Sequence, residues 1–572
     1  MQFRIKAKDG PARTGEISID KEKIVTPNIL FLDTPRFKAP DFADILLSKS
    51  NNTKKPVLKV KDEEVLKNLI EVVDEKYYFE FEENIITLKY AKQVFQRPKK
   101  FVDFLAELKQ KEDPGKTIFA PGIAYPSNLS LLVYLGIDLF DSSNAIIAAR
   151  ENIMFFSDGE YKTEELMELP CNCPICSSKK KPSKLEFEEI LSHNYNMLFN
   201  ELKQVRNMIK SGNLRNYVGK KVQSNPLYAT ILRNMDEKHY DYLEENTPVV
   251  GNKTIYATSI ESFGRPEIKR FQKRAIERYR KPASAKILLL LPCSARKPYS
   301  FSKTHRFLRR NILETNNPDI IHELIITSPI GLVPRELELT YPAANYDIPV
   351  TGTWSEDEKK MINTLLSDYL SKNKYDKIIM HLPKNITDFL KETVNKSVIS
   401  CIDDNPTSDE SLSALYKVLQ ENIEGYKKVN RQERQRESIE CIASYQFGRK
   451  TAEVLLKGAK ISGRYPMLKI TENKKQIGML IGEKGYISLT KEGAEKISTV
   501  CEYKVEIAGD FKPKGSILAP GIISANKNIR IGDEVLIFRK EKLLGVGSAC
   551  MNGSDMKKLD YGEAIKIRHI IS

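Results

Sequence analysis

The segment between Pro292 and His305 concentrates reactive side chains. It reads PCSARKPYSFSKTH and brings a thiol, hydroxyls, several cations and an imidazole together. Thiols, imidazoles and amines are groups that proteins use for nucleophilic and acid–base catalysis. The alternative for Cys293 alone is a buried cysteine at the end of a strand, because cysteine packs as a small apolar residue. We favour function for the whole segment, and the catalytic candidates are Cys293, Ser294, Arg296, Lys297 and His305.

A second cluster has the residue types and spacing of a metal site. Cys171, Cys173 and Cys176 occupy one tight turn, and His193 can join them from a following helix. Structural zinc uses four such ligands in a closed tetrahedron. Catalytic deaminase zinc also needs an upstream His or Cys followed by a proton-moving glutamate, and no His or Cys precedes Cys171. We therefore predict a structural Zn²⁺, with unmetallated buried cysteines as the alternative.

The helices and strands that must position the segment from Pro292 to His305 belong to a predicted parallel α/β domain. The aliphatic run 286–291 is typical of a strand buried on both faces. Similar runs recur at 324–327, 377–380 and 397–401 with helical segments between them, after a basic helix at 262–282. Ligands bind outside the carboxyl ends of such strands, so the segment after residue 291 is well placed for chemistry.

Other stretches predict further domains in a multidomain α/β protein. We expect a strand at 24–31, a helix at 60–73, a helix at 129–135 ending at Gly136, and a strand at 137–141. Charged residues at 425–440 indicate a linker or an exposed helix. Residues 430–497 predict a small α+β domain, and short glycine-separated strands beyond 500 indicate a β-barrel. The expected domains are 1–245, 265–420, 430–497 and 498–572.

The composition of the chain restricts the cellular compartment and the class of binding partner that we expect. The chain has 572 residues and a formal net charge of +15, which favours a polyanionic partner, although a solvated basic surface is the alternative. The first ten residues, MQFRIKAKDG, have no apolar core of a signal peptide. The aliphatic run at 287–291 is far shorter than the roughly 20 residues of a membrane span. Scattered cysteines suit a reducing cytosol, so we expect a cytoplasmic protein without a membrane partner.

The metal cluster carries a resemblance to a family. The C-x-C-x2-C turn and the following His-Asn pair come after the segment Gly-Ile-Asp-Leu-Phe-Asp at 136–141, and this order resembles the tRNA-guanine transglycosylases. The resemblance implies that Asp141 stands at the family's nucleophile position. The segment with the other active-site aspartate and the glycine-rich base-recognition loop are absent. The resemblance therefore implies a truncated TIM-barrel-like domain, in which Asp141 has a packing or base-binding role.

The reactive segment resembles the signature of the archaeosine synthase alpha-subunit family, and 331–338 and 341–347 are similar to its central domain. The resemblance implies a tRNA carrying preQ0 (7-cyano-7-deazaguanine) at position 15 and addition of an amine to the nitrile, giving an amidine. It implies free lysine as donor, with glutamine or ammonia as alternatives, and a radical-SAM lyase as partner. The candidates for substrate binding are Asp141, Tyr299, Glu336, Glu338 and Asp347.

Two mechanisms stay open for this implied reaction. Cys293 could add first as a thiolate, giving a thioimidate that lysine displaces, with Arg296 or Lys297 lowering the pKa of the thiol and His305 moving protons. Alternatively, lysine attacks the nitrile directly and Cys293 only lines the site. The acidic residues Glu336, Glu338 and Asp347 could bind the ammonium group of the donor or be solvated.

The last stretch resembles a PUA domain, by the segments 515–522, 531–535, 545–547 and 568–569. The resemblance implies that this barrel grips tRNA, since structured RNA is recognised largely by shape and backbone contacts; a dimer surface is the alternative. A homo-oligomer is expected. Two other functions stay open: a non-catalytic subunit that presents tRNA to a partner enzyme, and an active tRNA-guanine transglycosylase.

Overall fold

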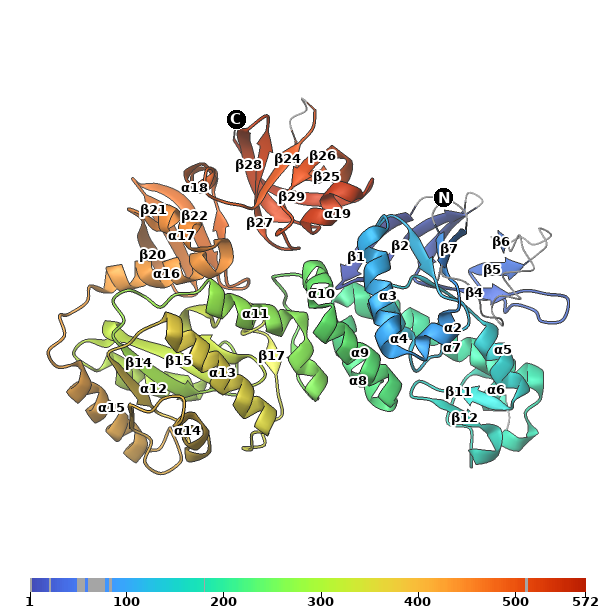
Figure 1. Cartoon of the computed structure of the whole chain (residues 1–572), viewed down its shortest axis with the longest axis horizontal. Helices are drawn as coiled ribbons and strands as arrows, with labels where there is room; N and C mark the ends of the chain where they lie inside the picture. Colours follow the sequence, from blue (N-terminus) through green and yellow to red (C-terminus); the bar gives the residue numbers. More distant parts are fainter. Residues whose placement is uncertain are drawn as a thin grey trace. The chain divides into compact units, whose positions relative to one another are not determined.

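The computed structural model describes residues 3–19, 22–48, 57–59, 78–81, 85–178, 181–509 and 513–571. The chain forms two compact units (Figure 1): unit 1 comprises Met1–Thr247, Leu518–Pro520 and Lys557–Gly562, and unit 2 comprises Pro248–Ile517, Gly521–Met556 and Glu563–Ser572. The helix expected at 60–73 lies outside the described residues. The four expected domain boundaries stay predictions.

Unit 1 begins with an antiparallel sheet of β1 (Phe3–Asp9), β2 (Ala12–Ile19) and β3 (Glu22–Thr26). The single strand expected at 24–31 is wrong, because this stretch contributes to β3 and then to β4 (Asn28–Leu32), which belong to different sheets. Pro27 separates them, and proline has no N–H with which to continue a ladder.

The second sheet of unit 1 has the strand order β6-β5-β4-β10-β9-β8-β7, and its pairs are parallel except for β7 with β8. Among the described residues no ladder joins β6 to β7, so the sheet has two edges. The interpretation of this sheet as part of a truncated TIM-barrel-like domain stays a prediction. The strands not yet given are β5 (Ile45–Ser48), β6 (Val57–Lys59), β7 (Tyr78–Phe81), β8 (Ile85–Leu88), β9 (Thr117–Phe119) and β10 (Leu139–Asp141).

Helices pack against this sheet through a core of apolar residues. The helix expected at 129–135 is confirmed as α4 (Leu129–Tyr134), and Gly136 follows it with φ +94°, a conformation that glycine adopts without strain. The other principal elements are α2 (Ala91–Phe95), α3 (Pro98–Lys111), α5 (Ser143–Arg150), β11 (Ile153–Phe155), β12 (Glu160–Lys162), α6 (Pro174–Ser178), α7 (Phe187–Ser211), α8 (Leu214–Lys221), α9 (Pro226–Lys238) and α10 (Tyr240–Asn246).

Unit 2 contains the predicted central sheet, with the order β16-β15-β14-β18-β19. All pairs are parallel except β15 with β16, and every residue of β14 is buried, which confirms the doubly covered strand. On one face, Leu289 and Leu291 pack with Leu308 and Leu415. The strands are β14 (Ile287–Pro292), β15 (Ile321–Thr327), β16 (Gly331–Pro334), β18 (Lys377–Met380) and β19 (Ser397–Ile399). The helices are α11 (Pro266–Glu277), α12 (Lys303–Leu313), α13 (Glu356–Lys372), α14 (Lys384–Leu390) and α15 (Asp409–Ile423).

The remainder of unit 2 is an α+β part followed by a β-rich part. The charged stretch 425–440 leads into α16 (Arg431–Phe447), whose first turn is exposed and whose later turns are buried. It precedes α17 (Arg449–Leu456), an antiparallel sheet of β20 (Lys460–Arg464), β21 (Met467–Glu472), β22 (Lys475–Ile481) and β23 (Tyr486–Leu489), and α18 (Lys491–Ile497). The last sheet has the order β25-β29-β28-β27-β24-β26. Its elements are β24 (Lys504–Ile507), β25 (Ser516–Leu518), β26 (Ile522–Ala525), β27 (Glu534–Arg539), β28 (Lys542–Ala549) and β29 (Glu563–Ile570), with α19 (Gly553–Lys558) before β29.

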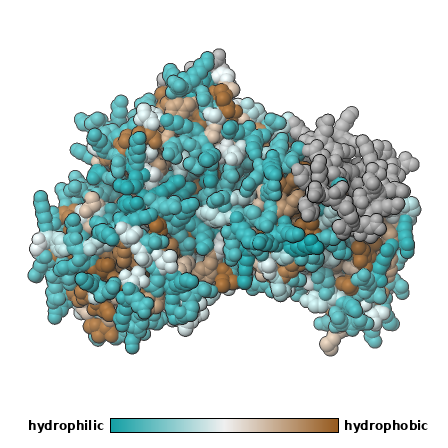
Figure 2. Space-filling view, viewed as in Figure 1, coloured by the Kyte–Doolittle hydropathy of each residue, from teal (hydrophilic) through white to brown (hydrophobic). Residues whose placement is uncertain are grey.

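The surface is dominated by polar side chains. Charged residues make up 29% of the sequence, and hydrophilic residues cover most of the face shown in Figure 2. Among the described residues, no helix combines the length and the apolar character that crossing a membrane requires.

Candidate functional site

The reactive segment lies where the sequence places it, between the carboxyl end of β14 and the start of α12. Ser302 caps α12, because its hydroxyl accepts a hydrogen bond from the backbone N–H of His305 at 3.1 Å. Pro292 pairs with Ile326, so the ends of β14 and β15 lie side by side and Cys293 is a neighbour of Thr327. Burial raises the pKa of the half-buried Cys293 thiol, while Thr327 and Lys297 oppose that shift.

A lysine and two tyrosines surround this thiol. Lys297 Nζ lies 4.2 Å from the centroid of the Tyr346 ring, and burial lowers the pKa of this lysine. The Tyr299 and Tyr346 hydroxyls are 2.5 Å apart, and the Thr327 hydroxyl also bonds Tyr346. A lysine with a lowered pKa beside a thiol can exchange protons with it more readily than a solvated lysine can.

The other polar residues near the thiol are more exposed. Asp347 is exposed at the edge of the cluster, where its charge opposes the lowering of the Lys297 pKa. Ser294 donates a hydrogen bond to the carbonyl of Arg296 at 3.0 Å, and Arg296 is exposed. The substrate-binding assignment of Asp347 and the catalytic assignments of Ser294 and Arg296 stay predictions.

His305 has a buried setting with two defined partners. Its Nε2 lies 3.0 Å from the carbonyl of Pro292, and its Nδ1 lies 2.8 Å from Arg335 Nη2. Since a guanidinium can only donate, Nδ1 accepts and Nε2–H donates. Burial, together with the charge of Arg335, lowers the pKa of His305 to about 4. The imidazole therefore connects the start of the reactive segment to Arg335 by two hydrogen bonds. The role of His305 in proton transfer stays a prediction.

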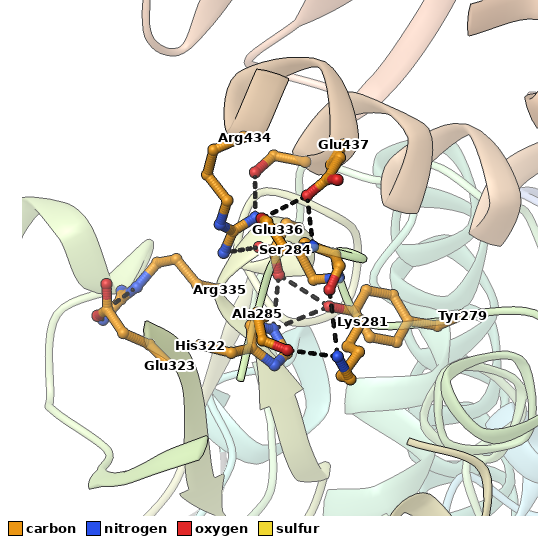
Figure 3. Close-up of polar contacts among 12 residues, drawn as sticks. Tyr279, Lys281, Ser284, Ala285, His322, Glu323, Arg335, Glu336, Arg434 and Glu437 are labelled. Carbon is orange, nitrogen blue, oxygen red and sulfur yellow. Dashed lines mark hydrogen bonds and ion pairs between the residues drawn. The ribbon is translucent and has the colours of Figure 1, made fainter. Parts of the chain in front are cut away.

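Glu336 and Glu338 are buried and paired. Glu338 accepts hydrogen bonds from the Ser300 backbone (2.9 Å), the Tyr465 hydroxyl (2.7 Å) and Arg335 (2.7 Å). Glu336 accepts from Tyr279 (2.9 Å) and Arg434 (3.1 Å) and lies 3.0 Å from His322 Nε2, as Figure 3 shows. Burial alone would raise the pKa of both carboxyls, but His322 and Arg434 hold the pKa of Glu336 below the usual range, and Arg335 does the same for Glu338.

Sequence reasoning missed the partners of these carboxylates. Tyr279, His322, Arg434 and Tyr465 come from four separate places in the chain. One signal was available, because His322 and Glu323 interrupt the otherwise aliphatic run of β15. Polar residues on a strand buried at every position require partners.

The predicted metal ligands converge in unit 1. One potential ligand atom from each of Cys171, Cys173, Cys176 and His193 lies within 4.8 Å of the others. His193 Nδ1 is 3.5 Å from Cys173 Sγ and 3.3 Å from Cys176 Sγ, close to the roughly 3.6 Å edge of a tetrahedron built with zinc bond lengths. His193 Nε2 donates to the carbonyl of Phe155 at 2.8 Å, which leaves Nδ1 free to bind a metal. The donor set fits a tetrahedral metal such as zinc.

Asp141 ends β10 and is held by hydrogen bonds from the loop after β9 and from the start of α5. It is 3% exposed and accepts hydrogen bonds from the backbone of Gly122 (3.1 Å) and of Ser143 (3.0 Å) and from the Ser143 hydroxyl (2.6 Å). Burial raises its pKa. The neighbouring parallel strand β4 is followed directly by Asp33, so two carboxylates stand at the same edge of the sheet. Asp33 is not among the candidates from the sequence, because its segment lacks the glycine-rich context of the family motif.

Four family models match successive parts of the chain. Residues 78–226 match the queuine tRNA-ribosyltransferase family, and residues 268–419 match a domain of unknown function that contains the reactive segment. Residues 437–504 match the patch-forming domain C2 of tRNA-guanine transglycosylase, and residues 508–571 match the PUA domain.

Curated relatives match over most of the chain. The archaeosine synthase subunit alpha of Methanosarcina acetivorans is 36% identical over 82% of this chain and 77% of its own length. The archaeosine synthase of Haloferax volcanii is 33% identical over 99% of both chains. A tRNA-guanine(15) transglycosylase of Methanobrevibacter smithii is 28% identical over 78% of this chain and 65% of its own length.

Proposed function

Since the chain belongs to the archaeosine synthase family, whose members are tRNA-modifying enzymes of archaeosine biosynthesis, we propose that it adds the side-chain amine of free lysine to the nitrile of preQ0 at position 15 of tRNA. The product is an amidine, which a radical-SAM lyase then processes. The observation that carries the proposal is the position of Cys293 beside Lys297, at the carboxyl end of β14. Open α/β sheets bind ligands at that edge.

The proposed chemistry proceeds in two steps. The Cys293 thiol adds across the C≡N bond, so that a C–S bond forms, the thiol proton leaves through Lys297, and the nitrile nitrogen gains a proton. The lysine amine then attacks the thioimidate carbon, the C–S bond breaks, and the thiolate leaves and regains its proton. The lowered pKa of Lys297 supports this role, because it makes the amine give up its own proton, and so become a proton acceptor, more readily than a solvated lysine does. Direct attack by lysine, with Cys293 only lining the site, is the alternative route.

Mass spectrometry of nucleosides tests the reaction. The full chain is incubated with preQ0-containing tRNA and lysine, and the digest is searched for a lysine adduct. We expect the adduct with the wild type, a loss of at least 100-fold with Cys293→Ala, and unchanged activity with Cys401→Ala, another partly exposed cysteine of unit 2. Normal turnover by Cys293→Ala would refute the covalent route. No adduct from the wild type would favour a subunit that only presents tRNA.

The other parts of the chain have supporting roles in this proposal. The cluster of Cys171, Cys173, Cys176 and His193 holds a structural Zn²⁺ that fixes its turn against α7. The PUA domain at 508–571 grips the tRNA, which suits the net charge of +15. Tyr299, whose ring is fully buried, supports the segment that meets the modified base through its hydroxyl contact with Tyr346. The active form is a homo-oligomer in the cytoplasm.

Base exchange is the second candidate function. It is favoured by the two carboxylates Asp33 and Asp141 at one edge of the unit 1 sheet, since exchange requires a nucleophile and a second acid–base group. Incorporation of labelled guanine into tRNA tests this candidate, with Asp141→Asn as the inactive control. Lack of incorporation by the wild type would exclude it.

A further inference from the structure

A cavity of about 290 Å³ lies within unit 2. Its walls come from α12, the start of β15, the segment after β16, α16 and the sheet β20–β23. The volume is at the lower end of the roughly 300–1,000 Å³ of small-molecule sites. The cavity therefore suits a compound of amino-acid size better than a nucleotide.

Polar residues in the wall of the cavity form hydrogen bonds with residues of the reactive segment. Arg335 contacts His305, and Glu338 binds the backbone and hydroxyl of Ser300. Arg309, on α12, donates to the Ser300 hydroxyl at 3.2 Å. A ligand in the cavity would therefore contact side chains that are hydrogen-bonded to the segment bearing Cys293.

One carboxylate in this wall has spare acceptor capacity. Both hydrogen bonds that Glu323 accepts from Arg335 reach its Oε2. Its Oε1 accepts none from the described residues and lies 3.6 Å from Arg309 Nε. Glu323 is only 8% exposed, whereas the side chain of Arg309 is 37% exposed. A buried acceptor beside a partly free guanidinium can bind an ammonium and a carboxylate on neighbouring atoms of one ligand.

Further cationic and apolar groups complete the wall. Arg431 is exposed, and no carboxylate partner is found for it in the part of the chain that the structure describes. Between the charged groups lie aliphatic side chains, among them Ile312, Leu468 and Leu480. These aliphatic surfaces can accommodate the aliphatic part of a ligand.

Other ligand classes fit this lining less well. Nucleobases are held largely by stacking on aromatic side chains. Among the described residues of the lining, Tyr465 is the only aromatic one, and its hydroxyl is bound to Glu338. Arg335 and Arg434 are already paired with the carboxylates of the wall, so a phosphate would meet fewer available cations than the number of arginines in the lining suggests.

We propose that this cavity binds the free amino acid that donates the amine. Glu323 binds its α-ammonium, Arg309 and Arg431 bind its α-carboxylate, and its side chain lies along the aliphatic wall, with the terminal amine not held by any of these three groups. This inference rests on the proposed function for the role of the ligand, but the binding site can be tested without tRNA.

Isothermal titration of the full chain with lysine tests the site. We expect one lysine per chain, about tenfold weaker binding to Arg309→Gln and to Arg431→Gln, and unchanged binding to Arg310→Gln. Arg310 is the matched control on α12, because it is 78% exposed and pairs with Glu314. No lysine binding by the tRNA-free wild type would overturn the proposal, and so would equal binding by all three variants.

Lysine analogues test the orientation of the ligand. Norleucine keeps both α-groups and should compete with lysine, whereas cadaverine lacks the carboxylate and 6-aminohexanoate lacks the α-amine, so both should compete at least tenfold less well. Equal competition by cadaverine would contradict the assignment of the α-carboxylate. Variant-sensitive lysine binding without any adduct on preQ0-tRNA would refute the proposed function but retain the site. Adduct formation with an unchanged KM for lysine in both arginine variants would refute the site alone.

Discussion

Replacing Arg434 with methionine should destabilise unit 2, because it leaves a buried carboxylate with too few partners. Arg434 and Glu336 are 12% and 3% exposed in their side chains, and their closest N–O distance is 3.1 Å. Removing one partner of a buried ion pair costs about 3–5 kcal/mol. Glu336 keeps Tyr279 and His322 as partners, so we expect a loss near the lower value, about 3 kcal/mol.

Urea denaturation followed by tryptophan fluorescence measures this loss. The sequence has one tryptophan, Trp354, which packs against Phe389 in unit 2 and reports on its unfolding. The control is Arg436→Met on the same helix, because Arg436 and Glu440 are each 31% exposed and a surface pair contributes about 0–1 kcal/mol. Losses of equal size for the two variants would refute the reasoning.

A double-mutant cycle and a pH series separate charge from packing. Glu336→Gln removes the buried charge, so the double variant Glu336→Gln/Arg434→Met should lose less stability than the sum of the single variants. In the wild type the pKa of Glu336 is lower in the folded protein than in the unfolded chain. The ionised carboxylate therefore contributes fully to the free energy of unfolding at pH values above its unfolded pKa of about 4.3. This contribution is lost as the pH falls through the pKa of the folded protein. In Arg434→Met, burial should raise that pKa, and the stability difference from the wild type should shrink from pH 7 to pH 4. A difference independent of pH would contradict this account.

Three further predictions concern the metal, the imidazole and the tRNA. Purified protein should contain one Zn²⁺ per chain by elemental analysis, and Cys176→Ser should lose it while Cys550→Ser retains it; equal zinc in both would contradict the ligand set. The His305 imidazole should stay neutral between pH 5 and 8 and titrate with a pKa of about 4 by NMR, because it is buried beside Arg335; a value near 6.5 would show that this burial is wrong. The affinity for tRNA should fall at least tenfold between 50 and 200 mM salt, since cationic contacts release counterions; a salt-independent affinity would argue against a backbone-gripping surface.

Local patterns predicted the elements that carry the candidate site. The aliphatic run before Cys293 predicted a buried strand, and that strand is β14. The three cysteines and the histidine of the candidate metal cluster were predicted from spacing alone, because a tight turn and one helix suffice to bring them together. The strand expected at 24–31 failed where Pro27 divides two sheets, although proline's missing N–H was visible in the sequence.

The reactive segment, its place after a buried strand and the candidate cluster of three cysteines and a histidine could be predicted from the sequence, because they depend on neighbours within a few dozen residues. The environment of the acidic residues could not be predicted in this way, because it depends on contacts between distant parts of the chain. Glu338 is paired through Tyr465, which is 127 positions away, and Glu336 through Arg434, which is 98 positions away. Residue periodicity shows which face of an element is buried but not which distant element covers it. The cavity that Glu323 and Arg309 help to line exists because α16 and the β20–β23 sheet pack over that wall.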